Sequence, residues 1–120
     1  MNASIREARR EGAPAIVGLI QALAEFEQLP GPDADAAARL VEHGFGERRH
    51  FESLVAEADG AIVGYAIYVT TYSTFRMRPT LFLEDLFVHP DARRHGIATA
   101  LYAKLGAQQL DAWRLCRVDL

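Results

Sequence analysis

The chain has 120 residues, half of them apolar, and a formal net charge of −3. One domain over residues 1–120 is expected, because a second hydrophobic core would leave neither core large enough to be stable. The composition excludes a disordered or collagen-like chain, and scattered basic residues in an acidic chain argue against a nucleic-acid binder. No apolar run approaches the roughly 20 residues that cross a bilayer, and the N-terminus lacks the apolar stretch of a signal peptide, so we expect a cytoplasmic protein without membrane contact.

The N-terminal third predicts a short strand and an amphipathic helix. Residues 4–8 are expected to form a brief edge strand, in which one isoleucine stands among charged residues. Pro14 suits the first turn of a helix, because its missing N–H group would have no partner there. Apolar residues then recur at spacings of three and four as far as Phe26, and the Pro-Gly-Pro sequence at 30–32 ends this element.

A second helix is expected after this break. The side chain of Asp33 or of Asp35 can accept a hydrogen bond from the first free amides of the helix and so cap its N-terminus. The helical spacing of apolar residues ends at Gly44, and 45–49 is interpreted as a connecting loop.

Three strands are predicted in succession. The apolar residues at 51–56 lead to an Asp-Gly pair at 59–60, which is a strong signal for a tight hairpin turn, and a long apolar strand follows over 61–72. Polar turn residues at 73–79 precede a third strand over 80–88. Two adjacent carboxylates interrupt the apolar run of this strand, and the run predicts a central position in the sheet.

The last part of the chain predicts a helix and a strand. A polar loop at 89–95 is followed by helical spacing from Ile97 to Leu105, and 115–120 alternates apolar and polar residues as a strand does. The strand at 80–88, this helix and the final strand would form a βαβ unit with parallel strands and a right-handed crossover. The order of the elements fits an α+β or α/β domain with a mixed sheet.

Cysteine and histidine spacing does not indicate a metal site. Cys116 is the only cysteine, so no intrachain disulfide forms and no site with several thiolate ligands can be built. No two histidines have a spacing that places both on one helical face, and we therefore expect no bound metal. The histidines are His43, His50, His89 and His95.

A turn rich in arginine joins the strand at 80–88 to the following helix. The first amides of a helix have no intrahelical partners and the helix dipole favours an anion there, while Gly96 lets the backbone come close to a phosphate. The spacing excludes the common nucleotide loops, since there is no Gly-Lys-Ser/Thr sequence and no run of three glycines. Residue chemistry alone leaves two interpretations open, an anion site and a plain strand-to-helix connection.

A motif in this turn resembles a known family. Arg93-x-x-Gly96-x-Ala98, after a strand that ends in Val88-His89-Pro90, resembles the pyrophosphate-binding motif of the GNAT superfamily of acetyl-CoA-dependent N-acetyltransferases. The resemblance implies an α+β (α/β-like) fold with a mixed, mainly antiparallel sheet flanked by helices and one βαβ cofactor-binding unit. Six segments resemble the diamine and thialysine acetyltransferase branch: Phe26-Glu27, 43–46, 55–57, 62–66, 72–75 and 81–88.

The resemblance assigns the acetyl-CoA contacts to the end of this strand and to the turn. The backbone of the last strand residues would hydrogen-bond the pantetheine arm, as an added strand would. The amides from Arg94 to Thr99 would hold the pyrophosphate, with favourable charge from Arg93 and Arg94. The cofactor-binding residues implied are Leu86, Phe87, Val88, Arg93, Arg94, His95, Gly96, Ile97, Ala98 and Thr99.

Glu84 is the candidate catalytic residue. A carboxylate inside an apolar strand is costly to bury unless it is paired or functional. In the enzymes that this chain resembles, a glutamate at this position takes the proton of the attacking amine, and the alternative is a structural salt bridge with an arginine. Asp85 should face the opposite side of a regular strand, unless a bulge re-aims the two side chains.

The resemblance implies a small primary amine as substrate, polyamine or lysine-like, bound by Phe26, Glu27 and Glu84. Glu27 would attract the cationic amine, or it is simply a solvated glutamate at a helix end. The acetyl group would move by direct attack, with the N–H of Leu86 as oxyanion donor.

The resemblance also bears on the C-terminal side of the fold. The relatives continue beyond Leu120 with another helix, two strands and the tyrosine that protonates the thiolate. We therefore expect a C-terminally short fold that pairs as a homodimer, and the alternative is a truncated, non-catalytic acyl-CoA-binding module.

Overall fold

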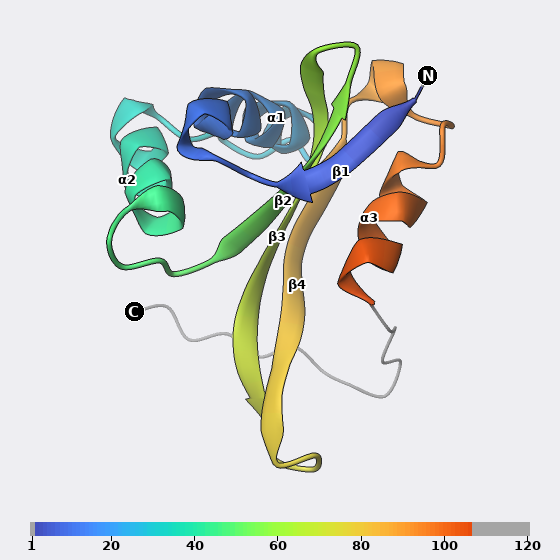
Figure 1. Cartoon of the computed structure of the whole chain (residues 1–120). Helices are drawn as coiled ribbons and strands as arrows, with labels where there is room; N and C mark the ends of the chain where they lie inside the picture. Colours follow the sequence, from blue (N-terminus) through green and yellow to red (C-terminus); the bar gives the residue numbers. More distant parts are fainter. Residues whose placement is uncertain (1, 107–120) are drawn as a thin grey trace.

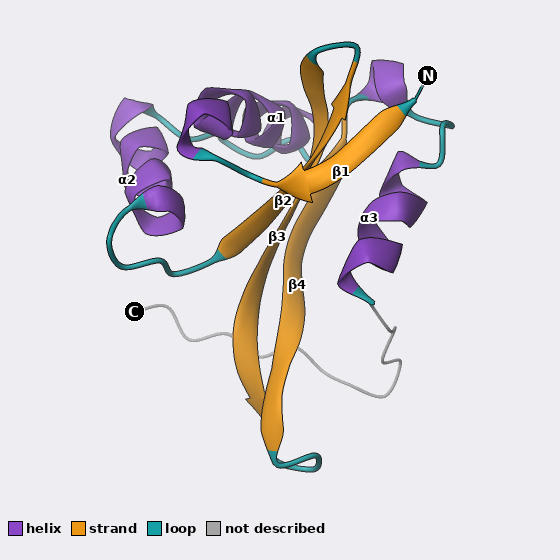
Figure 2. Ribbon diagram, in the orientation of Figure 1, coloured by secondary structure: helices purple, strands orange, loops and turns teal. Residues whose placement is uncertain are grey.

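The computed structural model describes residues 2–106. In chain order the elements are β1 (Ala3–Glu7), α1 (Ala13–Phe26), α2 (Ala34–Phe45), β2 (Glu52–Ala58), β3 (Ala61–Ser73), β4 (Arg78–Val88) and α3 (Ile97–Leu105), with single 3-10 turns at Arg10–Gly12 and Pro90–Ala92 (Figures 1 and 2). This arrangement confirms an α+β domain. The strand expected at 115–120, and with it the parallel half of the expected βαβ unit, lies outside the described residues.

The four strands of residues 2–106 form one sheet in the order β1-β2-β3-β4, and every neighbouring pair is antiparallel. The hairpin expected at 59–60 is confirmed. Asp59 and Gly60 both have positive φ angles, 53° and 78°, the backbone geometry that matches the right-handed twist of a tight hairpin. A mixed sheet is not seen in this part of the chain, because the described strands are joined by hairpins or by long connections that reverse direction.

The prediction that the strand at 80–88 is central is wrong for the described sheet, where β4 is an edge strand that pairs only with β3. Its last residues explain why the apolar pattern suggested otherwise. Phe87 is buried in the cluster formed with α1, and Val88 is buried in the cluster formed with α3. Both faces of this end of β4 are therefore covered by helices, which requires apolar residues at consecutive positions without requiring a second strand neighbour.

Helices cover the two faces of the sheet (Figure 1). On one face, Ile16 and Leu19 of α1 pack on a cluster that includes Val55, Tyr65 and Phe87. On the other face, α3 packs through its two buried residues, Ile97 and Leu101, on Leu54, Ala66 and Val88. The alternation of side chains along each strand separates these two cores.

Local signals account for the helix boundaries. Pro14 lies in the first turn of α1, as predicted. The side chain of Asp33, rather than that of Asp35, caps α2 by accepting a hydrogen bond of 2.8 Å from the amide of Ala36. Gly44 lies inside the last turn of α2, and it is buried because the ring of Phe51 occupies the space that a Cβ atom would need.

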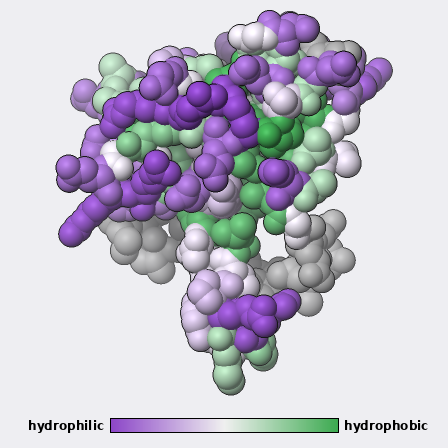
Figure 3. Space-filling view, viewed as in Figure 1, coloured by the Kyte–Doolittle hydropathy of each residue, from purple (hydrophilic) through white to green (hydrophobic). Residues whose placement is uncertain are grey.

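The far half of the β3–β4 hairpin, residues 69–82, projects as a two-stranded arm beyond the end of β2 (Figures 1 and 2). Phe75 and Met77 near its tip are 93% and 78% exposed. The space-filling view shows pale green, apolar residues at the end of this arm (Figure 3). An isolated two-stranded ribbon is only marginally stable in water. A contact that covers these apolar side chains would therefore stabilise the arm.

Candidate functional site

A β-bulge in β4 lies at Glu84. Ile67 of β3 pairs with Asp85, whereas the next residue, Tyr68, pairs with Leu83, so Glu84 is the extra residue of the ladder. The side chain of Glu84 is exposed, and within residues 2–106 it makes no ion pair. The salt bridge considered as a structural alternative is therefore not found in the described part of the chain.

Asp85 has a structural partner. It pairs with Ile67, whose side chain lies in the α1 cluster, and its Oδ2 atom accepts a hydrogen bond of 2.5 Å from the hydroxyl of Tyr65. The ring of Tyr65 is fully buried. Burial, and then the hydrogen bond and the negative charge of Asp85, raise the pKa of Tyr65 far above its usual range, so the hydroxyl stays a proton donor. The bulge thus leaves Glu84 exposed while its neighbour is held against the core.

The turn between β4 and α3 presents unpaired amides. Arg94 and Gly96 have positive φ angles, 68° and 74°, and α3 begins directly afterwards at Ile97. Within the described residues, no backbone carbonyl accepts a hydrogen bond from the amides of 94–99, the first bond of the helix being that from Ala100 to Gly96. Gly96 has no atom within 4 Å of the position of a Cβ, so the space beside it is open. These features fit an anionic group such as a pyrophosphate.

The side chain of Arg93 contacts the ends of β4 and α1. Its Nε atom donates a 3.0 Å hydrogen bond to the carbonyl of Val88. Its guanidinium carbon, Cζ, lies 5.5 Å from the centroid of the Phe26 ring and 5.3 Å from that of Phe87. Cation–π interactions occur at such distances. The guanidinium is thus engaged with protein groups, and the contribution of its charge to the cofactor site stays a prediction.

The residues expected to bind the substrate lie where α1 ends. Phe26 is its last residue, with a side chain that is 67% exposed, and Glu27 follows as the C-cap. The guanidinium of Arg93 lies over the ring of Phe26 and over that of Phe87. Sequence reasoning missed the role of Tyr65, because β3 carries several other hydroxyl side chains and nothing in the sequence distinguishes Tyr65 from them.

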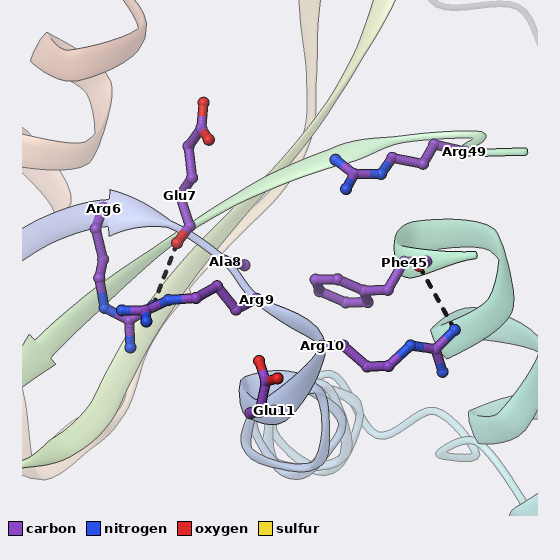
Figure 4. A pocket seen from close by; sticks show the side chains of 8 residues that line it. All are labelled: Arg6, Glu7, Ala8, Arg9, Arg10, Glu11, Phe45 and Arg49. Atoms are coloured by element: carbon purple, nitrogen blue, oxygen red, sulfur yellow. Dashed lines mark hydrogen bonds between the residues drawn. The ribbon is translucent and has the colours of Figure 1, made fainter. Parts of the chain in front are cut away.

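A hollow of about 650 Å³ in the described surface lies apart from these residues (Figure 4). It is lined by Arg6, Glu7, Ala8, Arg9, Arg10, Glu11, Phe45 and Arg49, none of them a predicted site residue. Three of its four arginines are paired with carboxylates, at 3.0 Å for Arg6, 3.7 Å for Arg10 and 3.4 Å for Arg49. Because these pairs already neutralise most of the positive charge, the hollow does not form a strong anion site.

Residues 2–106 show neither a membrane-spanning helix nor a metal site. None of the helices there has the length and apolar character needed to span a membrane. Among the same residues, no group of three or more His, Cys, Asp and Glu side chains is arranged to hold a metal ion.

Residues 16–118 match the sequence profile of the Acetyltransferase (GNAT) family, and the chain belongs to this family. Membership implies that acetyl-CoA is the acyl donor, and the open turn at 94–99 fits that group. The thialysine N-epsilon-acetyltransferase of Mus musculus is 37% identical over 115 residues, in an alignment that covers 89% of this chain and 67% of that protein. The chain thus spans about two thirds of the length of this relative.

Solved structures share the fold. A possible acetyltransferase from Clostridium difficile superposes with a TM-score of 0.76 at 23% identity, over 88% of this chain and 70% of that one. An aminoglycoside N-acetyltransferase solved in complex with CoA superposes with a TM-score of 0.69 at 28% identity, over 88% of this chain and 67% of that one.

Proposed function

We propose that this protein transfers the acetyl group of acetyl-CoA to a small primary amine of the polyamine or lysine-like kind. The observation that carries the proposal is the position of Glu84, an exposed carboxylate on a bulge of the strand that leads into the anion-binding turn. Similarity to thialysine acetyltransferases supports the class of amine. A carboxylate beside the place where an amine must lose a proton is the arrangement that N-acetylation requires.

The cofactor is proposed to lie along the end of β4 and over the start of α3. Within residues 2–106 the outer edge of β4 has no strand neighbour, and the backbone of Leu86, Phe87 and Val88 is proposed to meet the pantetheine arm there. The amides of 94–99 would hold the pyrophosphate. The carbonyl of Val88 already accepts from Arg93, but a carbonyl oxygen has a second lone pair. Acetyl-CoA supplies the activated acetyl thioester.

Glu84 is proposed to accept the proton of the amine, directly or through one water molecule. A lysine-like amine has a reference pKa of about 10.4 and is protonated at neutral pH, so it cannot attack until that proton is removed. The neutral amine nitrogen would then attack the thioester carbonyl, so that the N–C bond forms and the C–S bond breaks. The second proton lost by the nitrogen would go to the leaving thiolate, which gives the amide and the free thiol of coenzyme A. The N–H of Leu86 would stabilise the oxyanion of the intermediate.

Phe26 and Glu27 are proposed to form the amine-binding end of the site. Glu27 has no ion pair among the described residues, so its charge is available to a cationic substrate. A homodimer is proposed from the exposed apolar tip of the β3–β4 arm, because such a surface is usually covered by a partner.

Release of free thiol from acetyl-CoA tests the proposal. Spermidine, putrescine, thialysine and lysine should be assayed separately, with a reaction lacking amine as the blank. Amine-dependent release with at least one of them is expected. Tight binding of acetyl-CoA without release in any reaction would instead leave a non-catalytic acyl-CoA-binding module.

A further inference from the structure

One side chain joins the two halves of the proposed site. Arg93 is the first residue of the anion-binding motif, yet its guanidinium lies against Phe26 at the end of α1 and against Phe87 in β4. Its Nε atom is bonded to the carbonyl at the end of β4. The end of α1, which is distant in sequence, therefore meets the end of β4 and the loop after it at this guanidinium.

The two rings differ in how firmly they are held. Phe87 is only 5% exposed and belongs to the α1 core cluster, so its ring is held in place by the surrounding core side chains. Phe26 is 67% exposed and belongs to neither core cluster of the described residues. The ring of Phe26 is thus held by its contact with Arg93 rather than by burial. A planar guanidinium suits this position, because it can stack on a ring while its N–H groups donate in the plane.

The residues that end α1, 27–29, depend on tertiary contacts for their order. Gln28 has a φ angle of 58°, a left-handed conformation that terminates the helix at the cost of some strain. The amides of Glu27, Gln28 and Leu29 bond only to carbonyls of the preceding turn, at 2.8 to 3.1 Å. Without a tertiary contact, such a last turn frays.

We propose that Arg93 is a positioning residue that couples the cofactor half of the site to the amine half, an inference that rests on the proposed function. By holding Phe26, Arg93 holds the adjoining Glu27 beside the end of β4. A pyrophosphate bound to the amides of 94–99 orders the loop that carries Arg93, and this order is transmitted to the end of α1. Bound coenzyme A therefore favours binding of the amine, and by reciprocity the amine favours binding of the cofactor.

Hydrogen exchange of the full chain tests the coupling without any turnover. Phe26→Leu removes the aromatic face but keeps the apolar bulk, and Arg93→Gln removes the charge but keeps N–H donors. Each variant should raise the exchange rate of the amides of 27–29 by roughly two- to five-fold, the range expected for one cation–π contact. The double variant should show no larger effect than either single variant.

Leu29→Ala is the matched control, because Leu29 lies in the same segment and is similarly exposed, at 63%, but does not stack on Arg93. It should leave the exchange of amides 27 and 28 near the wild-type rate. Unchanged exchange in Arg93→Gln, or fully additive effects in the double variant, would overturn the proposal.

Added coenzyme A provides the second readout. In the wild type it should slow exchange both at 94–99 and at 27–29, whereas in Phe26→Leu only the protection at 94–99 should remain. No protection at 94–99 in the wild type would contradict the proposed cofactor site. Protection at 94–99 without protection at 27–29 in the wild type would contradict the coupling alone.

Kinetics then distinguish positioning from general damage. Arg93→Gln and Phe26→Leu should raise the KM for the amine identified by thiol release, with little change in kcat, and Arg93→Lys should recover part of the loss. Equal loss of kcat in all three variants would assign Arg93 a structural role instead.

Discussion

The hydroxyl of Tyr65 donates a hydrogen bond of 2.5 Å to the carboxylate of Asp85, across the β3–β4 pair and next to the bulge at Glu84. The bond holds the carboxylate of Asp85 against the core, whereas the neighbouring carboxylate of Glu84 stays exposed. Because Tyr65 is completely buried, this contact is shielded from water on the side of α1.

Removal of this hydroxyl should destabilise the protein. Tyr65→Phe is expected to lower the free energy of unfolding by about 1–3 kcal/mol, since it leaves the half-buried Asp85 without its donor. Urea denaturation measures the change. Tyr72→Phe, at an exposed tyrosine of the same strand, is the control and should be nearly neutral. An effect of similar size in both variants would contradict the role of the bond.

The same pair should make stability depend on pH in the alkaline range. The pKa of Tyr65 is raised in the folded state above its ordinary value of 10.0, so above that pH the unfolded chain loses a proton that the folded chain keeps. The contribution of Tyr65 to the free energy of unfolding should therefore be constant below pH 10. Above pH 10 it should fall, by at most about 1.4 kcal/mol for each pH unit. Tyr65→Phe should flatten this fall. Burial also raises the pKa of Tyr68, so the stability of Tyr65→Phe should still fall slightly with pH in the alkaline range. Adding Tyr68→Phe should remove this remaining dependence.

Acetyl-CoA should stabilise the folded protein, and Gly96→Val should abolish that stabilisation. A valine strains the positive φ angle of 74° and fills the open space beside the turn. Gly106→Val is a matched control, because Gly106 has a φ angle of 66° and equally open surroundings but caps the other end of α3. Both variants should lose Tm, but only Gly96→Val should lose the shift with acetyl-CoA. A retained shift in Gly96→Val would remove the turn from the cofactor site.

Glu84→Gln should lower kcat by roughly 100-fold or more while the affinity for acetyl-CoA stays close to that of the wild type, since the amide keeps the shape but accepts no proton. The loss should shrink at high pH, where more of the amine is already neutral. Steady-state rates between pH 7 and 10, with binding measured by calorimetry, check both parts. Glu11→Gln, at an exposed glutamate outside the proposed site, should behave as the wild type. Full activity of Glu84→Gln at neutral pH would show that the proton leaves by another route.

Association should depend on the tip of the β3–β4 arm. Phe75→Ser combined with Met77→Ser should weaken the homodimer, because these side chains are the most exposed large apolar groups of residues 2–106. Sedimentation or light scattering over a dilution series gives the dissociation constant. A wild-type monomer at micromolar concentration with full turnover would reject the dimer.

Local sequence signals determined much of the fold. The Asp-Gly pair at 59–60 supports positive φ angles that other residues resist, so a hairpin could be placed without knowing its surroundings. The cap at Asp33 and the apolar spacing of α1 are likewise short-range effects of backbone hydrogen bonding and helical periodicity. The turn at Gly96 belongs to this group, because its positive φ angle and the start of α3 directly after it are local properties of the backbone.

Only the tertiary structure decided how the site is assembled. The bulge at Glu84 is a property of the register between two strands, and no preference of the residues in β4 alone specifies it. The partners of Tyr65 and Arg93 depend on which elements the packed core brings together. The end of β4 is apolar on both faces because helices cover them, although β4 is an edge strand of the described sheet. Hydrophobic burial is non-directional, so an apolar pattern states that a residue is covered but not what covers it.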